Sequence, residues 1–269
     1  MKWKADNEFV KVNGRTLYRN DMRVLGYTAT GVTFRFKGKK ASAVLLSDVE
    51  GRTQDSLAWM AVFVNDQTTP AKRFPLKEAE AEYTLYESDQ EAEVTITLMK
   101  YSEVEYAKCL IKEIITDSDT LLAPPQQKKR KMLIIGDSIT CGFGVEGDVE
   151  DEIFCTAKEN PSKAYSLLTA QELEAEYQIV AWNGKGVISA YIGEEGDEPD
   201  PQWRLPFLYD YTDGGSEQDY YKKEEKDWEK WNHQSYQADI VTVYLGTNDA
   251  SYTREIPQTR SLLMHTNCS

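Results

Sequence analysis

Apolar and polar residues alternate with a period of two through about residue 122. In the segment VTFRFKG the apolar residues Val32, Phe34 and Phe36 share one face, and AEVTITLMKY continues the same alternation. The segment AWMAVFVND is a more continuous apolar run that ends in an Asn-Asp turn signal. Many short strands separated by turns predict an antiparallel β-sandwich.

A segment with two adjacent prolines, LLAPPQQKKRK, separates this half from the rest of the chain. Prolines followed by polar and basic residues are typical of an interdomain linker, which we place at residues 123–131. Residues 1–122 are then expected to form the first domain and residues 132–269 the second.

After the linker, short apolar runs alternate with a helical pattern. Residues 132–136 and the runs QIVAW and ADIVTVYLG have the composition of buried strands. Between the first two, PSKAYSLLTAQELEAEY places Ala164, Leu167, Leu168 and Tyr177 at helical spacing. Strands that alternate with helices predict a parallel sheet with crossover helices, so the second domain is expected to be α/β.

A long acidic and aromatic segment, roughly residues 190–236, lies between the second and third of these strands. We expect irregular structure there, followed by a short amphipathic helix near residues 217–231. Aromatic side chains crowd this segment and suit either a sugar-binding cleft or packing of the segment on its own domain. They are Tyr191, Trp203, Tyr209, Tyr211 and Trp228.

Composition excludes several classes of partner. The 269-residue chain has 31 Lys and Arg against 45 Asp and Glu, a formal net charge of −14 that disfavours nucleic acid as a partner. Its apolar runs are far shorter than a membrane helix, so no membrane partner is expected. The N-terminus MKWKADNEFV has no apolar signal segment, which predicts a cytoplasmic location unless the N-terminus is trimmed. The four cysteines, too widely spaced for a metal or redox pair, are expected to be free thiols: Cys109, Cys141, Cys155 and Cys268.

The segment KMLIIGDSITCGFGVEGD contains a glycine pattern that could bind a phosphate. Gly142, Gly144 and Gly147 spell G-x-G-x-x-G, the pattern of dinucleotide-binding turns. In those folds the glycines form the turn that leaves the strand, whereas Gly142 lies six residues beyond Gly136. The acidic run DVEDEIF that follows would repel a phosphate, so the glycines are expected to shape a loop and no cofactor is expected.

The same segment could instead expose a serine nucleophile. Ser138 follows the first strand of the second domain, WNGKGV with Gly184 follows the next, and LGTNDAS with Asn248 follows the third. Because the carboxyl ends of parallel strands meet at one edge of a sheet, the three residues are expected to converge there. A hydroxyl, a free backbone amide and a carboxamide are the groups that acyl transfer requires. The alternatives are a helix N-cap for Ser138 and a turn residue for Asn248.

These blocks resemble a known family. IGDSITCGFGV, NGKGV and LGTNDASY resemble the first three sequence blocks of the SGNH (GDSL-like) hydrolases. Together with GRTLY in the N-terminal half, they resemble carbohydrate esterase family 2. That family pairs a jelly-roll β-sandwich with a flavodoxin-like, three-layer α/β SGNH domain and removes acetyl groups from plant polysaccharides. The resemblance implies an acetylated carbohydrate as substrate and assigns no oligomeric state.

The resemblance also implies roles for individual residues. Ser138 is then the nucleophile, and its own amide, the amide of Gly184 and the side-chain amide of Asn248 form the oxyanion hole. A glycine is needed at position 184 because a side chain would block access to its N–H. Gly186, two residues later, is the alternative source of this amide. Asp137 and Asp249 are expected to be structural.

The sequence departs from this family in the catalytic base. The family takes its histidine from a D-x-x-H block downstream of the asparagine, and neither His233 nor His265 stands in such a block. We hypothesise that the coding sequence is interrupted near residue 257 and that the α/β domain is incomplete. Missing elements would leave a strand edge and apolar helix faces exposed and lower the solubility. The alternative function is a catalytically dead carbohydrate-binding protein.

Overall fold

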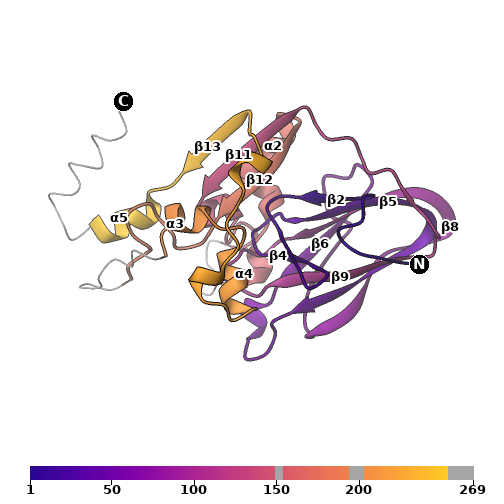
Figure 1. Ribbon diagram of the computed structural model, residues 1–269, viewed down its shortest axis with the longest axis horizontal. Helices are drawn as coiled ribbons and strands as arrows, with labels where there is room; N and C mark the ends of the chain where they lie inside the picture. Colours follow the sequence, from indigo (N-terminus) through magenta and orange to yellow (C-terminus); the bar gives the residue numbers. More distant parts are fainter. Residues whose placement is uncertain (149–153, 194–202, 254–269) are drawn as a thin grey trace.

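The computed structural model describes residues 1–148, 154–193 and 203–253. Figure 1 shows a large antiparallel sheet beside a smaller α/β part. The strands of the large sheet are β1 Lys2–Trp3, β2 Val10–Asn13, β3 Leu17–Arg19, β4 Met22–Leu25, β5 Gly31–Ser47, β6 Trp59–Val64, β7 Lys72–Pro75, β8 Glu80–Lys100, β9 Cys109–Thr116 and β10 Leu121–Leu122.

Two long strands organise the antiparallel sheet. Its path is β3-β4-β9-β5-β8-β6-β7, with β1 paired to β9 and both β2 and β10 paired to β5. Strands β5 and β8 pair along most of their length, with register shifts between Gly38 and Lys40 and between Ala41 and Ser42. Such irregularities bend the strands. The first half of β5 pairs with β2 and β10, and its second half pairs with β9.

The bent sheet encloses an apolar core. Val32, Phe34 and Phe36 are completely buried in it, with Ile96 and Leu98 from β8 beside them. The period-two pattern therefore predicted the buried face of these strands correctly. The antiparallel N-terminal architecture is confirmed in the form of one curled sheet.

The second part contains a parallel sheet in the order β12-β11-β13, flanked by short helices. Its strands are β11 Arg130–Gly136, β12 Ala175–Ala181 and β13 Ile240–Tyr244. The helices are α1 Ser138–Cys141, α2 Tyr165–Glu172, α3 Leu205–Tyr209, α4 Gly214–Asp219 and α5 Thr247–Thr253. Short 3₁₀ turns lie at Gln54–Ser56, Thr156–Lys158, Pro161–Lys163, Glu225–Asp227 and His233–Ser235. The predicted α/β fold is confirmed.

The two parts share an apolar core. Ala61 and Met99 from the antiparallel sheet pack in the same cluster as Ile134 of β11, Leu167 of α2 and Ile179 of β12. Tyr177 donates a hydrogen bond from its hydroxyl to the Ala29 carbonyl at 2.9 Å. The parallel sheet is therefore fixed to the curled sheet through packed side chains.

Two predicted helices are wrong in extent. Helix α2 ends at Glu172, and Glu174 adopts a left-handed conformation with φ 49° that turns the chain into β12. Tyr177, predicted in the helix, is therefore a strand residue. In the second case α4 ends at Asp219, and Lys222 has φ 53°, so the predicted helix over residues 217–231 is largely irregular chain.

The start of β11 also modifies the predicted organisation. This strand begins at Arg130, inside the segment predicted as linker. Leu121, just before that segment, is buried and pairs with Phe36 of β5.

Within the described residues, no helix combines the length and the apolar character that crossing a membrane requires.

Candidate functional site

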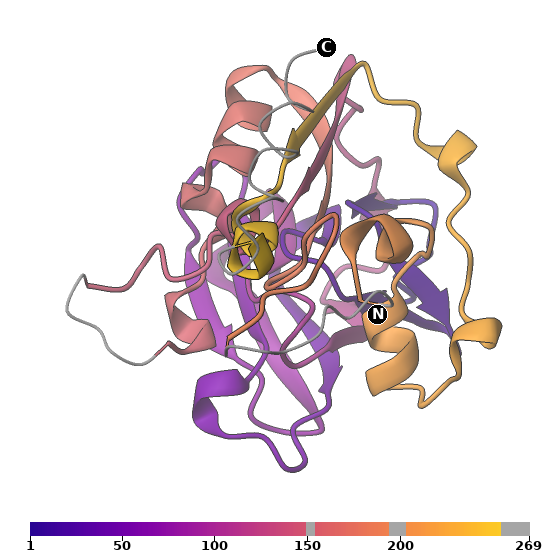
Figure 2. The ribbon, with the colours of Figure 1, turned by 90° about the vertical axis from the view of Figure 1, so that its left-hand side faces the viewer.

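Three loops leave the carboxyl ends of the parallel strands at one edge of the sheet. Gly136 at the end of β11 lies opposite Ala181 of β12 and Tyr244 of β13. Ser138 follows β11 and begins α1, Gly184 follows β12, and Asn248 lies in the first turn of α5 after β13. Figure 2 views the molecule from the side of this edge, with α5 in front.

A tight turn carries Ser138 to the start of α1. Asp137 is the N-cap, and its Oδ1 accepts the Ile139 amide at 3.0 Å. At Gly136 a Cβ would lie 1.8 Å from the Thr140 Oγ1, so this position has to be glycine for the turn to close. Burial raises the pKa of the Asp137 carboxyl, against two amide hydrogen bonds that lower it. Asp137 thus has the predicted structural role, and Ser138 itself is half-buried.

The turn after β12 depends on a left-handed glycine. Gly184 has φ +71°, and its carbonyl accepts the Tyr191 amide at 2.6 Å. A Cβ at this glycine would meet only Tyr191, at 3.9 Å. Backbone conformation therefore gives one reason for the glycine here. The reason expected from the sequence, access of a ligand to the Gly184 N–H, stays a prediction.

Asn248 connects the third loop to the second. Its side chain is 6% exposed, and Nδ2 donates to the Lys185 carbonyl at 3.0 Å. A carboxamide nitrogen carries two hydrogens, so this bond engages one of its two donors. Asn248 is thereby fixed next to the residue that follows Gly184.

Asp249 anchors the loop beyond Gly184, as the sequence predicts. Its buried carboxylate accepts the amides of Val187 at 3.0 Å, Ile188 at 2.6 Å and Ser189 at 3.0 Å. A Cβ at Gly186 would lie 2.5 Å from the Asp249 Oδ1, which explains this second glycine by close approach. Together, Asn248 and Asp249 connect α5 to the loop after β12.

His233 lies away from this edge. Its Nε2 is 3.3 Å from the Asp210 Oδ1, and its ring centroid is 4.8 Å from that of Tyr209. The chain that follows enters β13 at the opposite end of the sheet, where the Tyr236 hydroxyl donates to the Met132 carbonyl at 3.2 Å. His265 and the predicted interruption near residue 257 lie outside the described residues.

The aromatic residues of the long segment divide into two groups. Tyr211 and Trp228 are buried, with ring centroids 5.2 Å apart. Trp203 lies 5.9 Å from Trp228 and 5.8 Å from Trp182, which follows β12, so the segment packs on its domain. Tyr209 stacks on the buried Arg15 guanidinium at 5.0 Å. Tyr191, by contrast, is 58% exposed beside Gly184. Of the five, Tyr191 is the one exposed beside the Gly184 turn.

The pattern formed by Gly142, Gly144 and Gly147 shapes a loop, as expected. Gly142 and Gly144 have φ of 79° and 69°, and Gly142 ends α1. The Glu146 carboxylate between the last two glycines pairs with Lys163 at 2.8 Å and with Arg73 at 3.4 Å.

The cysteines of the described chain are free thiols, at positions 109, 141 and 155, and position 268 lies outside it.

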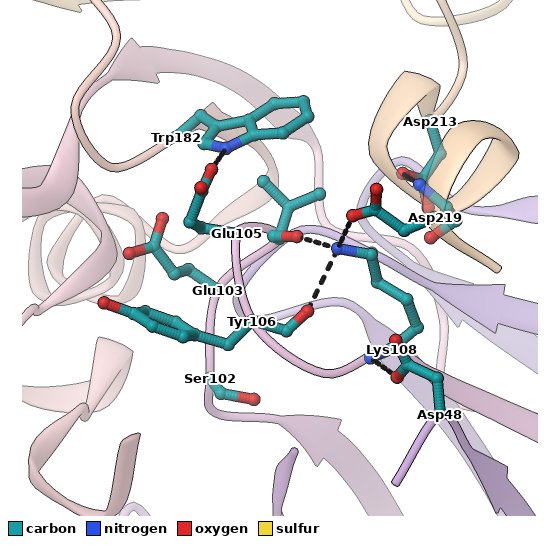
Figure 3. Close-up of polar contacts among 12 residues, drawn as sticks. Asp48, Ser102, Glu103, Glu105, Tyr106, Lys108, Trp182, Asp213 and Asp219 are labelled. Carbon is teal, nitrogen blue, oxygen red and sulfur yellow. Dashed lines mark hydrogen bonds and ion pairs between the residues drawn. The ribbon is translucent and has the colours of Figure 1, made fainter. Parts of the chain in front are cut away.

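Two acidic residues near the site, Glu103 and Glu105, are not predicted from the sequence. They lie between β8 and β9, and Figure 3 shows Glu105 accepting a hydrogen bond from the Trp182 indole nitrogen. Glu103 Oε2 accepts the Asn183 amide at 2.6 Å. Nothing in the local pattern YSEVEYAKC distinguishes them from solvated carboxylates, because their partners are in the other half of the chain.

Comparison with protein families agrees with this geometry. Residues 12–125 match the model "Carbohydrate esterase 2 N-terminal", and residues 132–267 match the model "GDSL-like Lipase/Acylhydrolase". The second match covers just over half of the chain. The chain belongs to the GDSL-like lipase/acylhydrolase family, within the group whose N-terminal part is that of carbohydrate esterase family 2.

Characterised relatives are longer than this chain. An acetylxylan esterase / glucomannan deacetylase of Cellvibrio japonicus is 26% identical over 92% of the chain and 63% of its own length. The cellulase/esterase CelE of Acetivibrio thermocellus is 27% identical over 91% of the chain and 27% of its own length. The chain thus spans less than two thirds of either relative.

Solved structures show the same fold. A family two carbohydrate esterase from Cellvibrio japonicus has a TM-score of 0.78 at 24% identity, covering 98% of this chain and 75% of that one. The acetyl xylan esterase Est2A from the rumen bacterium Butyrivibrio proteoclasticus has a TM-score of 0.78 at 23% identity, covering 93% and 66%.

Proposed function

We propose that this chain is a serine esterase that removes O-acetyl groups from carbohydrates through an acyl-enzyme on Ser138. The observation that carries the proposal is the edge where the Ser138 hydroxyl, the left-handed Gly184 and the Asn248 carboxamide follow three adjacent parallel strands. The names of the relatives, acetylxylan esterase and glucomannan deacetylase, support an acetylated polysaccharide as substrate.

The proposed reaction has two steps. The Ser138 Oγ attacks the acetyl carbonyl carbon, and the carbonyl electrons move to the oxygen, which becomes negative. The amides of Ser138 and Gly184 and the second Nδ2 hydrogen of Asn248 then donate to this oxygen. Collapse of the intermediate breaks the bond between the acetyl carbon and the sugar oxygen, and this oxygen takes up the serine proton and leaves as a hydroxyl. Water then attacks the acyl-serine, which releases acetate and returns a proton to the Ser138 oxygen.

The serine proton needs a base in this scheme. The single histidine among the described residues, His233, pairs with Asp210 near the other end of the sheet. This placement favours a second candidate function, a protein that binds acetylated carbohydrate without turning it over. The two functions differ in whether Ser138 becomes acylated.

Hydrolysis of p-nitrophenyl acetate and acetate release from acetylated xylan test the proposal. For the esterase we expect turnover that falls by up to about 10⁶-fold in Ser138→Ala, because the nucleophile is lost. His233→Ala is the matched control and should leave turnover unchanged, since this ring contacts Asp210 and Tyr209. Binding of acetylated xylan without acetate release would support the second candidate and contradict the esterase.

A further inference from the structure

The loop that joins β8 to β9 reaches from the curled sheet to the proposed active site. Figure 3 shows Glu103 and Glu105 on this loop, with Glu105 bonded to the indole nitrogen of Trp182. Trp182 and Asn183 immediately precede Gly184, whose amide the proposed mechanism uses. Glu105 and Glu103 of this loop thus accept hydrogen bonds from Trp182 and Asn183 of the α/β part.

One oxygen of Glu103 contacts both the turn at Trp182–Gly184 and helix α1, which begins with Ser138. Glu103 is completely buried, and its Oε2 lies 2.6 Å from the Asn183 nitrogen and 3.8 Å from the Cys141 Sγ. Cys141 is the last residue of α1, which begins with Ser138. A shift of this carboxyl would therefore alter the placement of Gly184 relative to Ser138.

The loop that carries Glu103 is held rigidly by two buried lysines. The Lys100 ammonium donates to the carbonyls of Gly26, Ser102 and Glu103 at 2.8, 2.8 and 2.7 Å. Lys108, at the other end of the loop, donates to the carbonyls of Val104 and Tyr106. Buried ammonium groups with several carbonyl acceptors leave the loop little freedom.

A second buried carboxyl supports Glu103 from behind. The Glu103 amide donates to the Glu159 Oε2 at 2.9 Å, and Glu159 is itself completely buried. Burial raises the pKa of Glu103 to about 7, and burial together with the neighbouring Glu103 raises the pKa of Glu159 well above its ordinary value. Two neighbouring buried carboxyls hold a proton between them over much of the neutral range.

We propose that Glu103 is a positioning residue of the esterase site, which fixes the Trp182–Gly184 turn against the Ser138 helix and thereby sets the geometry of the oxyanion hole. This inference rests on the proposed function for its catalytic consequence, and on contacts alone for the positioning itself. It gives a connecting loop of the curled sheet a positioning role at the site, because Glu103 lies between β8 and β9.

Asp48, which directly follows β5, offers a matched control because it bonds the same loop from another segment. Its Oδ1 accepts the Lys108 amide at 2.6 Å, the same distance as between Glu103 and the Asn183 amide. Figure 3 shows Asp48 at the end of the loop away from Trp182. Removal of either carboxylate loosens the loop, but only Glu103 touches the turn before Gly184.

The experiment combines amide hydrogen exchange with steady-state kinetics on four variants. Glu103→Asp keeps the acid but draws it back from the Asn183 amide, Glu103→Ala removes it, and Glu103→Gln keeps an acceptor of the same length. We expect faster exchange at residues 182–187 and about a 10²-fold lower kcat with nearly unchanged KM in the Asp and Ala variants. Glu103→Gln should restore both readouts, and Asp48→Ala should speed exchange at Lys108 alone.

Unchanged exchange at residues 182–187 in Glu103→Asp would overturn the inference, whatever the activity. If Glu103→Gln were as impaired as Glu103→Asp, a role through the amide acceptor would be excluded. Exchange also separates this inference from the proposed function. If Glu103 protects these amides in the wild-type protein but no acetate is released, the esterase function is contradicted. The positioning contact of Glu103 still stands in that case.

Discussion

Single carboxylates decide the shape of the loops at this edge, and Asp249 is the clearest case. Its carboxylate accepts three consecutive backbone amides, at residues 187, 188 and 189, and it is 2% exposed. Asp249→Asn replaces one acceptor oxygen by a donor that faces these amides. We predict a loss of about 3 kcal/mol in the free energy of unfolding. A hydrogen bond to a charged group contributes about 1.5–3 kcal/mol to stability.

Urea unfolding of Asp249→Asn measures this loss. Asp117 is a suitable control, because its exposed carboxylate also accepts consecutive amides, from Lys39 and Lys40. Asp117→Asn should cost much less, since water replaces the lost bonds at an exposed site. Equal losses in the two variants would argue against a special role of the Asp249 anchor.

At the scale of elements, β13 is an exposed edge strand. Within the described residues it pairs with β11, and Val241 and Val243 on one of its faces are 57% and 62% exposed. Exposed edge strands with apolar side chains promote association between chains.

We predict that Val243→Lys reduces concentration-dependent association without lowering the melting temperature. A lysine on an edge strand places a charge where a second strand would pair. Leu168→Lys adds the same charge on α2, where Leu168 is 45% exposed, and should have little effect on association. Light scattering over a range of concentrations distinguishes them, and an equal effect of both substitutions would assign the association to net charge.

At the scale of the whole molecule, the buried carboxyls between the two parts make stability depend on pH. Burial raises the pKa of Glu103 to about 7 from 4.5, and burial together with the neighbouring Glu103 raises the pKa of Glu159 well above its ordinary value. Between pH 4.5 and about 7 the folded chain therefore binds more protons than the unfolded chain, so the free energy of unfolding falls as pH rises. Glu113 and Glu146, whose pKa values are lowered by hydrogen bonds to lysines, give stability that is already complete above about pH 4.5.

Lys100 acts in a higher window. Burial lowers the pKa of its ammonium to about 8 from 10.5, so this group by itself adds stability as pH rises through that window. The buried Cys109 and Cys141 thiols, whose pKa values burial raises from 9.0, act in the opposite direction there. We therefore predict a change for the lower window alone: the urea midpoint should fall from pH 5 to 7. Glu103→Gln should flatten this fall, and a midpoint that rises steadily from pH 5 to 7 in the wild type would contradict this assignment.

The sequence predicted the features that depend on local periodicity and on strand order. Val32, Phe34 and Phe36 alternate in the chain and are buried together. Ser138, Gly184 and Asn248 follow adjacent parallel strands, so their common edge could be inferred from order alone. Their roles in catalysis stay predictions.

Features set by tertiary contacts could not be predicted. Tyr177 fits a helical spacing, but its segment pairs with β11 as a strand once Glu174 turns the chain. Glu103 and Asn183 are 80 residues apart, in different parts of the molecule, and no local pattern marks their contact. Such contacts depend on how two sheets pack, which periodicity within either sheet does not specify.

In the proposed reaction Ser138 carries the acetyl group during turnover. Mass analysis of protein quenched during hydrolysis of an acetyl ester detects this intermediate. We expect the mass of one acetyl group on the peptide that contains Ser138, and its absence in Ser138→Ala. An acetyl group on another residue, or hydrolysis at an undiminished rate in Ser138→Ala, would contradict it.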